Sequence, residues 1–344
     1  MNILVEKFNQ SEKYIVQGKD IESEQILLEL IQFDDIKAVV CYRLGQIYNR
    51  MGRIDDSIIY HEMAFHTNPA LIRKIVSEDH PNINYIYSKE EETLITDCPL
   101  CSKKGVLHSC YNVAQDFGFI KGFNPVKVWM YCKKCHHIYT NSYPKNIQQI
   151  LSNDCSNLYI EPKTYEIQPA ANIISKLKKI VKGNSYLEVG VGTGVMLLIA
   201  KEYGFNVEGI DIRSFYAEQA SRLSNTIVHS IDYHDFLVEK QYDVIVMGDV
   251  LEHVVNPVKM IEKTYNLLSD EGILWISTPN FDSAYPTIMK DKDPMWWVTE
   301  HINYFSFNSL QYILNKYHFK VIDYHVSSKF NGSMEVIAQK TFSK

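Results

Sequence analysis

The stretch Leu187-Glu188-Val189-Gly190-Val191-Gly192-Thr193-Gly194 is the most informative part of this 344-residue chain. Its apolar beginning is typical of a buried strand, and the apolar run 195–200 directly after it is typical of a helix. The three glycines predict a tight turn whose backbone can lie close to a ligand, because glycine has no side chain. A second short strand, 206–211, ends at Asp211, where an acid can hydrogen-bond a ribose.

The loop resembles the first motif of class I S-adenosylmethionine (SAM)-dependent methyltransferases, since its glycines are spaced Gly-x-Gly-x-Gly. A dinucleotide-binding loop has Gly-x-Gly-x-x-Gly instead. The alternative is a glycine-rich turn that binds nothing, and the motifs further along the chain disfavour it. The resemblance implies a set of cofactor-binding residues at the ends of successive strands: Glu188, Gly190, Gly192, Gly194, Asp211, Ile212, Asp232, Tyr233, Gly248 and Asp249.

Strand-like and helix-like segments alternate after this loop. Five further strands are expected, over residues 226–229, 242–247, 272–277, 320–324 and 334–338. The last two should form an antiparallel pair that closes the sheet. The alternation predicts an α/β fold with a doubly wound, seven-stranded Rossmann-like sheet, which binds ligands at the carboxyl ends of its strands. We assign this methyltransferase domain to residues 146–344, with lid helices at its start and Tyr159 and Tyr165 as candidate lid residues.

The segment after the 242–247 strand resembles that of ubiquinone-biosynthesis O-methyltransferases and sugar C-methyltransferases. In the ubiquinone enzymes the matching positions can hold a divalent cation, so the resemblance implies Mg²⁺ on Asp249, Glu252 and His253. Carboxylate oxygens and water are suitable Mg²⁺ ligands. The alternative, which we favour, is that Glu252 and His253 line the pocket at the methionine end of the cofactor.

A second segment, 296–306, combines aromatic residues with acid and base groups. Glu300 and His301 match a Tyr-x-Glu-His cluster that forms the acceptor site in the resembled sugar C-methyltransferases, whereas Val298 stands at the tyrosine position. Transfer of a methyl group to oxygen or carbon needs a base. The candidate catalytic residues are therefore His301, Glu300 and His253. The alternative for His301 is a structural hydrogen bond.

Two Cys-x-x-Cys pairs lie upstream of this domain: Cys98, Cys101, Cys132 and Cys135. Four thiolates suit a tetrahedral, structural Zn²⁺ site, whereas a redox-active pair would want a thioredoxin-like setting that the sequence lacks. We therefore expect a zinc ribbon over residues 97–145. Its lysines, Lys127 among them, and its interleaved aromatic residues could contact a nucleic acid. A solvated lysine face over a small aromatic core is the preferred interpretation.

Residues 1–75 look entirely helical and contain an internal repeat of 34 residues. The second copy, with Gly45, Tyr48 and Gly52, resembles the tetratricopeptide (TPR) consensus. Two such repeats bury too little surface alone, so we expect them to dock on the rest of the chain or to self-associate. A surface for a protein partner and a merely stabilising cap are both open interpretations. Residues 76–96 are expected to form a linker.

The composition is that of an ordinary globular protein, with 46% hydrophobic and 22% charged residues. The net charge of -6 argues against extensive nucleic-acid binding. The sequence shows no long apolar run and no signal-peptide pattern, so we expect a cytoplasmic protein without membrane contact.

The expected function is SAM-dependent methyl transfer to an O or C atom of a small-molecule acceptor, such as a sugar or a nucleotide-linked compound. One alternative is an RNA or protein acceptor, recruited by the zinc ribbon and the TPR-like region. A non-catalytic SAM-binding scaffold is a third interpretation, which the acceptor-side residues Glu300 and His301 disfavour.

Overall fold

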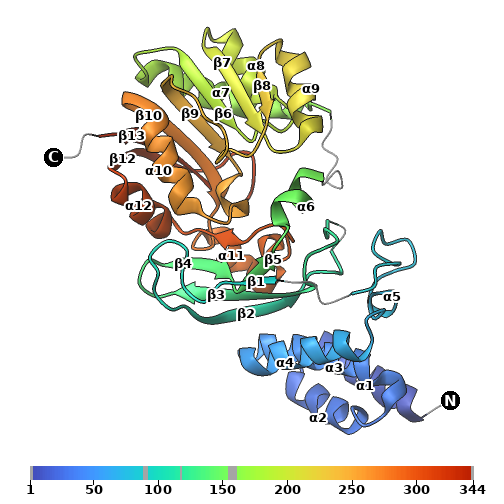
Figure 1. The fold of residues 1–344 in the computed structure, drawn as a ribbon. Coiled ribbons are helices and arrows are strands. Elements are labelled where there is room, and N and C mark those ends of the chain that lie inside the picture. Colours follow the sequence, from blue (N-terminus) through green and yellow to red (C-terminus); the bar gives the residue numbers. More distant parts are fainter. Residues whose placement is uncertain (1–2, 88–91, 117, 154–160, 342–344) are drawn as a thin grey trace.

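The computed structural model describes residues 3–87, 92–116, 118–153 and 161–341. Helices at the N-terminal end lie against a small sheet, which in turn lies against a larger sheet flanked by helices (Figure 1). Of the two candidate lid residues, Tyr159 lies outside the described residues, and Tyr165 is exposed on a helix. Within the described ranges, no helix has the length and apolarity needed to cross a bilayer.

The N-terminal part consists of two helical hairpins and one short helix: α1 (Ile3–Val16), α2 (Asp20–Leu30), α3 (Asp34–Arg50), α4 (Ile54–Thr67) and α5 (Ile72–Ile75). The same hydrogen bond occurs once within each of the two hairpins. Ser23 Oγ donates to the carbonyl oxygen of Ser11 (3.1 Å), and Ser57 Oγ donates to that of Gly45 (2.7 Å). Both residues of the second contact lie 34 positions after those of the first, so the sequence repeat is also a repeat of structure. Membership of the TPR family stays a prediction.

The small sheet has four antiparallel strands in the order β11-β4-β3-β2: β2 (Val106–Asn112), β3 (Val126–Cys132), β4 (His137–Thr140) and β11 (Asn303–Tyr304). Next to β4 in the sequence, β5 (Ser142–Pro144) pairs with β1 (Glu92–Leu94), and α6 (Ile147–Asn153) comes after it. The strand β11 comes from the segment that the sequence assigns to the methyltransferase domain. The ribbon and that domain therefore share one sheet, which the boundary expected at residue 146 does not reveal.

The second helical hairpin packs on strand β2. Tyr42 Oη donates to Gln115 Oε1 (2.7 Å), and the backbone N–H of Cys110 donates to Asn49 Oδ1 (2.9 Å). The segment expected to be a linker packs here too, because the buried side chain of His80 hydrogen-bonds the backbone oxygen of Gln115 (2.9 Å). The helical region thus docks on the rest of the chain, which is one of the two arrangements expected from the sequence.

The large sheet has seven strands in the order β12-β13-β10-β9-β6-β7-β8: β6 (Ser185–Val189), β7 (Asn206–Asp211), β8 (Val228–Ser230), β9 (Tyr242–Gly248), β10 (Leu268–Pro279), β12 (Phe319–Val326) and β13 (Ser333–Lys340). Strands β10, β9, β6, β7 and β8 are parallel, and β13 is antiparallel to both of its neighbours. This confirms the predicted α/β sheet with an antiparallel closing pair. Strand β8 is shorter than expected, because residues 226–227 belong to the connection that precedes it.

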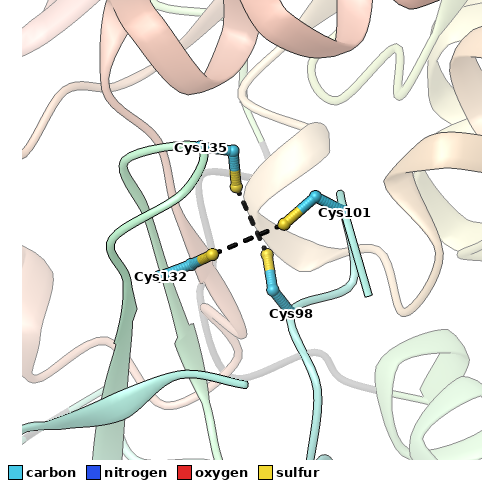
Figure 2. Close-up of side chains that lie close together, drawn as sticks. All are labelled: Cys98, Cys101, Cys132 and Cys135. Atoms are coloured by element: carbon cyan, nitrogen blue, oxygen red, sulfur yellow. Dashed lines mark hydrogen bonds between the residues drawn. The ribbon is translucent and has the colours of Figure 1, made fainter. Parts of the chain in front are cut away.

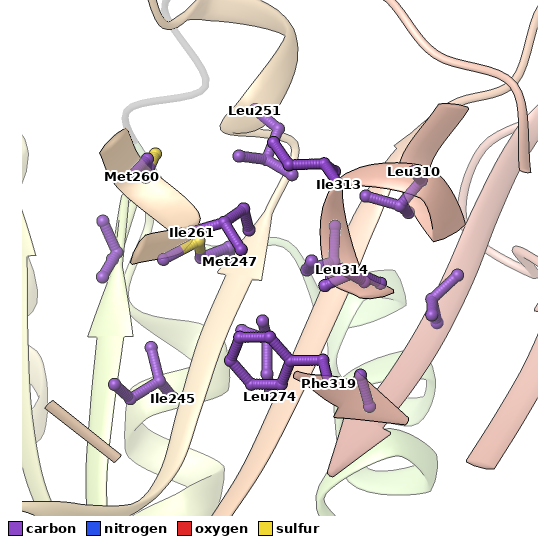
Figure 3. Close-up of a cluster of buried hydrophobic side chains, with 14 of the residues drawn as sticks. Ile245, Met247, Leu251, Met260, Ile261, Leu274, Leu310, Ile313, Leu314 and Phe319 are labelled. Carbon is purple, nitrogen blue, oxygen red and sulfur yellow. The ribbon is translucent and has the colours of Figure 1, made fainter. Parts of the chain in front are cut away.

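Helices cover both faces of this sheet, as a doubly wound fold requires. One face is covered by α7 (Thr164–Ile180), α8 (Val195–Glu202) and α9 (Ser214–Ser224), and the other by α10 (Pro257–Leu267) and α12 (Phe307–Lys316). Figure 3 shows the second core, where Ile245 and Met247 of β9 meet Ile261 of α10 and Ile313 of α12. Short elements lie beyond the carboxyl ends of β9 and β10: η1 (Leu251–His253), α11 (Ala284–Met289), η2 (Lys290–Lys292) and η3 (Pro294–Trp296).

Candidate functional site

The glycine loop connects β6 to α8, and its three glycines all have positive φ. A Cβ at Gly190 would lie 2.6 Å from Val250 Cγ2, and one at Gly194 would lie 2.8 Å from the backbone of Ala220. A Cβ at Gly192 would meet no atom within 4 Å among the described residues. Gly190 and Gly194 are therefore required by packing within the protein, whereas the backbone at Gly192 faces space that a ligand can occupy.

Asp211 fixes this loop to the end of the neighbouring strand β7. Its buried carboxylate accepts hydrogen bonds from the backbone N–H of Gly192 (3.1 Å) and from the backbone N–H of Arg213 (3.0 Å). Ile212, which lies between Asp211 and Arg213 in the sequence, is half-buried. The predicted ribose-binding acid thus lies beside the loop, as the sequence spacing requires, and it also holds the loop in place.

Glu188 is a buried acid just before the loop. Burial raises the pKa of its carboxyl from 4.5 to about 8, and this effect outweighs a hydrogen bond from Tyr186 Oη and the positive charge of Lys329. In the ligand-free protein the carboxyl is therefore mostly protonated at neutral pH. A positively charged ligand beside it would favour the ionised form, because opposite charges lower the pKa of an acid.

The candidate adenine-binding residues come after β8. Asp232 accepts hydrogen bonds from the backbone N–H of His234 (2.7 Å) and from Gln148 Nε2 of α6 (2.9 Å). Tyr233 is buried, and its hydroxyl hydrogen-bonds Thr264 Oγ1 (3.0 Å) in the core. Only the backbone of Tyr233 therefore remains for a ligand, and α6 lies next to Asp232.

The candidate catalytic residues meet at the carboxyl end of β9. The ligand atoms of Glu252, His253 and His301 lie within 4.8 Å of one another, and the two imidazole centroids are 4.7 Å apart. The backbone N–H of Ile302 donates to the carbonyl oxygen of Glu252 (2.9 Å), which brings the two segments together. The side chain of His253 also hydrogen-bonds the backbone of Glu300.

Burial sets the charge of this group. It lowers the pKa of His253 to about 3 and that of His301 well below its usual value, and neighbouring positive charges add to both shifts. It raises the pKa of Glu252 well above its usual value, with the charge of Asp249 adding to the shift. Both imidazoles are therefore neutral at physiological pH, which is the state that a general base needs.

The residues predicted for Mg²⁺ are only partly brought together. Asp249, in the left-handed region (φ 54°), accepts a hydrogen bond from Ser277 Oγ (3.0 Å) and lies outside the group formed by Glu252, His253 and His301. The structure thus groups His301, rather than Asp249, with Glu252 and His253, and the Mg²⁺ set implied by the resemblance stays a prediction. One carboxylate and two imidazoles suit a transition metal better than Mg²⁺, which prefers oxygen ligands.

The four predicted zinc ligands converge on one point (Figure 2). Cys98 Sγ lies 3.5 Å from Cys135 Sγ, and Cys101 Sγ lies 3.4 Å from Cys132 Sγ. In a tetrahedral site with Zn–S bonds of about 2.3 Å, sulfur atoms lie about 3.8 Å apart. The cluster could therefore hold one zinc ion with little adjustment, and four sulfur ligands would leave no position open for a substrate.

Lys127 is a residue of the candidate site that the sequence did not single out. It was expected on a solvated face, but only 7% of it is exposed. Its Nζ donates to the carbonyl oxygens of Val298 and Thr299 (3.2 Å for the second), next to Glu300. The available signal was its position inside the otherwise apolar run 126–131, where a solvated lysine is out of place.

Comparisons with known proteins agree with this geometry. Residues 164–324 match the family model described as a methyltransferase domain. The ubiquinone biosynthesis O-methyltransferase of Actinobacillus pleuropneumoniae serotype 7 is 30% identical over 109 residues, which are 28% of this chain and 47% of that protein. The protein of the same name from Rickettsia conorii is 26% identical over 197 residues, 51% of this chain and 66% of that protein. The chain thus spans about half the length of the first relative.

Solved structures similar to this chain include the magnesium protoporphyrin IX methyltransferase of Synechocystis PCC 6803 with bound S-adenosylhomocysteine (SAH). It is 16% identical, with a TM-score of 0.44, and the match covers 57% of this chain and 94% of that one.

Proposed function

We propose that this protein moves a methyl group from SAM to an O or C atom of a small-molecule acceptor. The starting point is that residues 164–324 carry a methyltransferase domain of the SAM-dependent class. The observation that carries the proposal is the grouping of two neutral imidazoles, His253 and His301, beside Glu300. This group stands at the end of β9, the direct neighbour of the strand β6 that bears the glycine loop. Cofactor and acceptor would therefore meet at one edge of the sheet.

SAM, when bound, supplies a methyl group that its sulfonium already activates, so the protein mainly has to align the acceptor. Gly192 would leave room for the cofactor, and Asp211, which lies beside the loop, would hold its ribose. His301 is the proposed base, which takes a proton from the acceptor atom. His253 hydrogen-bonds the backbone of Glu300, which holds the acceptor segment, residues 296–306, next to η1.

The cysteine cluster is part of the proposal as a structural zinc site. Its ligands would be Cys98, Cys101, Cys132 and Cys135, all of which are free of disulfides. A zinc site needs reduced cysteines, and cysteines stay reduced in the cytoplasm, which is the location expected from the sequence. A sugar or nucleotide-linked acceptor is the finer hypothesis, since a similar zinc-binding region accompanies the acceptor site in the resembled sugar C-methyltransferases.

A second candidate is an RNA or protein acceptor recruited by the ribbon and the helical region. Several ribbon aromatics are buried, among them Phe119, Phe123 and Trp129, which argues against their use as a surface for stacking bases. The α3 face that contacts Gln115 and Cys110 is also occupied by the ribbon. A protein partner or a second copy of the chain would have to bind another face of the helices.

The test is transfer of labelled methyl groups. The protein is incubated with methyl-labelled SAM and with separate extracts of small molecules, RNA and proteins. Label in the small-molecule extract supports the proposal, and label in RNA or protein supports the second candidate. The absence of label from all three, under conditions where SAH binds, would support the scaffold interpretation and contradict both.

Glu188→Gln should stabilise the ligand-free protein and weaken cofactor binding. The folded-state pKa of about 8 lies above the ordinary 4.5, so the unfolded chain loses this proton first. Wild-type stability therefore falls as the pH rises from 4.5 to 8, and the variant lacks this loss. We expect a gain on the order of 4 kcal/mol at pH 8 and weaker SAH binding.

The measurement is urea unfolding at pH 6 and pH 8, followed by calorimetric titration with SAH. Exposed Glu202, at the end of α8, provides the matched control variant Glu202→Gln. A variant Glu188→Gln that loses stability at pH 8, or that binds SAH as tightly as the wild type, would contradict the assigned role of Glu188.

A further inference from the structure

Lys127 links the ribbon to the acceptor segment. It lies in β3, opposite Tyr111 of β2, and its ammonium lies 4.6 Å from the centroid of the Trp129 ring. It donates to the carbonyl oxygens of Val298 and Thr299, which are the two carbonyls directly before Glu300 and His301 in the chain.

The carbonyl of Val298 connects Lys127 to the proposed base. It also accepts a hydrogen bond from the backbone N–H of His301 (3.3 Å), so one oxygen receives both Lys127 Nζ and the His301 amide. The turn 298–301 is therefore closed by its own backbone and fixed from outside by the ribbon. Losing Lys127 Nζ would leave the Val298 carbonyl with the amide of His301 as its donor within this turn.

Other ribbon residues hold the same segment. Trp129 Nε1 donates to the carbonyl oxygen of Trp296 (3.3 Å), and the backbone N–H of Ile120 donates to Thr299 Oγ1 (3.4 Å). Strand β11, which directly follows Ile302 in the chain, also attaches the segment to the ribbon, because it pairs with β4. The position of the acceptor segment is therefore set from the ribbon side as well as from η1.

Burying a lysine lowers the stability of a fold, so a position that serves only packing favours an apolar side chain. Moving an ammonium out of water costs several kcal/mol unless it is paired and hydrogen-bonded. The neighbouring positions of β3, Val126 and Val128, are filled by apolar side chains, which pack without that cost. Burial lowers the pKa of Lys127 to about 7, while the charge of Glu300 opposes the shift. Its positive charge also contributes to the lowered pKa of His253 and of His301.

We propose that Lys127 is a positioning residue of the acceptor site: its ammonium, by holding the carbonyls of Val298 and Thr299, orients Glu300 and His301 for methyl transfer. The ribbon is then a working part of the active site and more than a structural cap. This inference rests on the proposed function, because it takes the 298–301 turn to be the acceptor side.

The test compares Lys127→Met, which keeps the length of the side chain without its donors, with Lys127→Arg, which keeps donors and charge. The control is Lys121→Met, an exposed lysine of the same ribbon. We measure kcat and KM with an acceptor found in the labelling assay, SAH affinity, zinc content and hydrogen exchange of the amides in residues 298–303. Lys127→Met should lower kcat by about 10-fold to 100-fold, because misplacing a catalytic group has effects of this size.

In the same variant, SAH affinity, KM for SAM and zinc content should stay at wild-type values, and the amide of His301 should exchange faster. Lys127→Arg should recover part of kcat, and Lys121→Met should behave as the wild type. An unchanged kcat, or equal losses of kcat, SAH affinity and zinc in both Lys127 variants, would overturn the positioning role. If no acceptor is methylated at all, the proposed function fails, whereas the exchange of His301 still shows whether Lys127 orders the turn.

Discussion

Replacing His301 by alanine should lower the rate of methyl transfer by about 10²-fold to 10⁴-fold, which is the usual contribution of a general base. The imidazole is buried and neutral, and its neutral neighbour His253 is engaged with the backbone of Glu300, so few other groups can take over proton removal. SAH affinity should be unchanged, since the glycine loop and Asp211 lie on other strands. The measurement is the steady-state rate with saturating SAM, together with a calorimetric titration with SAH.

The same variant separates the two roles open to His301. A metal content determined for wild type and His301→Ala should give one zinc per chain in both if His301 is a base. The loss of a second metal ion in the variant would assign His301 to a cation site with Glu252 and His253. The control is the variant His318→Ala, which removes an exposed histidine. Full activity of His301→Ala would contradict the assignment of the base.

Cys98→Ser should remove the zinc and destabilise far more than the ribbon. Structural zinc contributes about 10–16 kcal/mol to the folding of zinc-finger peptides, so losing one ligand is a severe change. Cys98, Cys132 and Cys135 belong to the same buried cluster as Leu310 and Ile313 of α12, so the disturbance should reach the large sheet. We expect near-complete loss of zinc and an unfolding midpoint lowered by roughly 10 °C or more.

The measurements are elemental analysis and thermal unfolding, with Cys41→Ser as the control. Cys41 is buried between α3 and the ribbon, outside the cysteine cluster, so its variant should keep all of the zinc. A chelator should reproduce the effect of Cys98→Ser on the wild type. Wild-type protein without zinc, or a Cys98→Ser protein as stable as the wild type, would contradict the structural role of the metal.

The large sheet was predictable because its signals are local. The strand, glycine turn and helix around Gly192, and Asp211 at the end of β7, can be recognised from apolar patterns and spacing within a few tens of residues. The antiparallel closing pair β12 and β13 was found in the same way. The cysteine spacing likewise predicted four sulfur atoms that the fold brings together.

The unpredicted features all depend on contacts between distant segments. Strand β11 has only two residues, so no periodic pattern marks it, and its partner β4 lies far away in the chain. Lys127 is buried because the acceptor segment folds over β3, which the alternation of one strand cannot show. The grouping of His301 with Glu252 and His253 has the same origin, since the turn 298–301 is brought to η1 by tertiary contacts.

If the loop at Gly192 holds SAM beside a proton-accepting site, calorimetric titration of the zinc-loaded chain with SAM and SAH should detect both ligands. We expect one site per chain with a dissociation constant on the order of micromolar, and no binding in Gly192→Trp, whose indole would fill the open space at the loop. The variant should keep its zinc, while its unfolding midpoint should fall, because the φ of Gly192 is positive (49°) and any side chain there is strained. Absence of heat with both ligands in the wild type, or equal affinity in Gly192→Trp, would contradict the account.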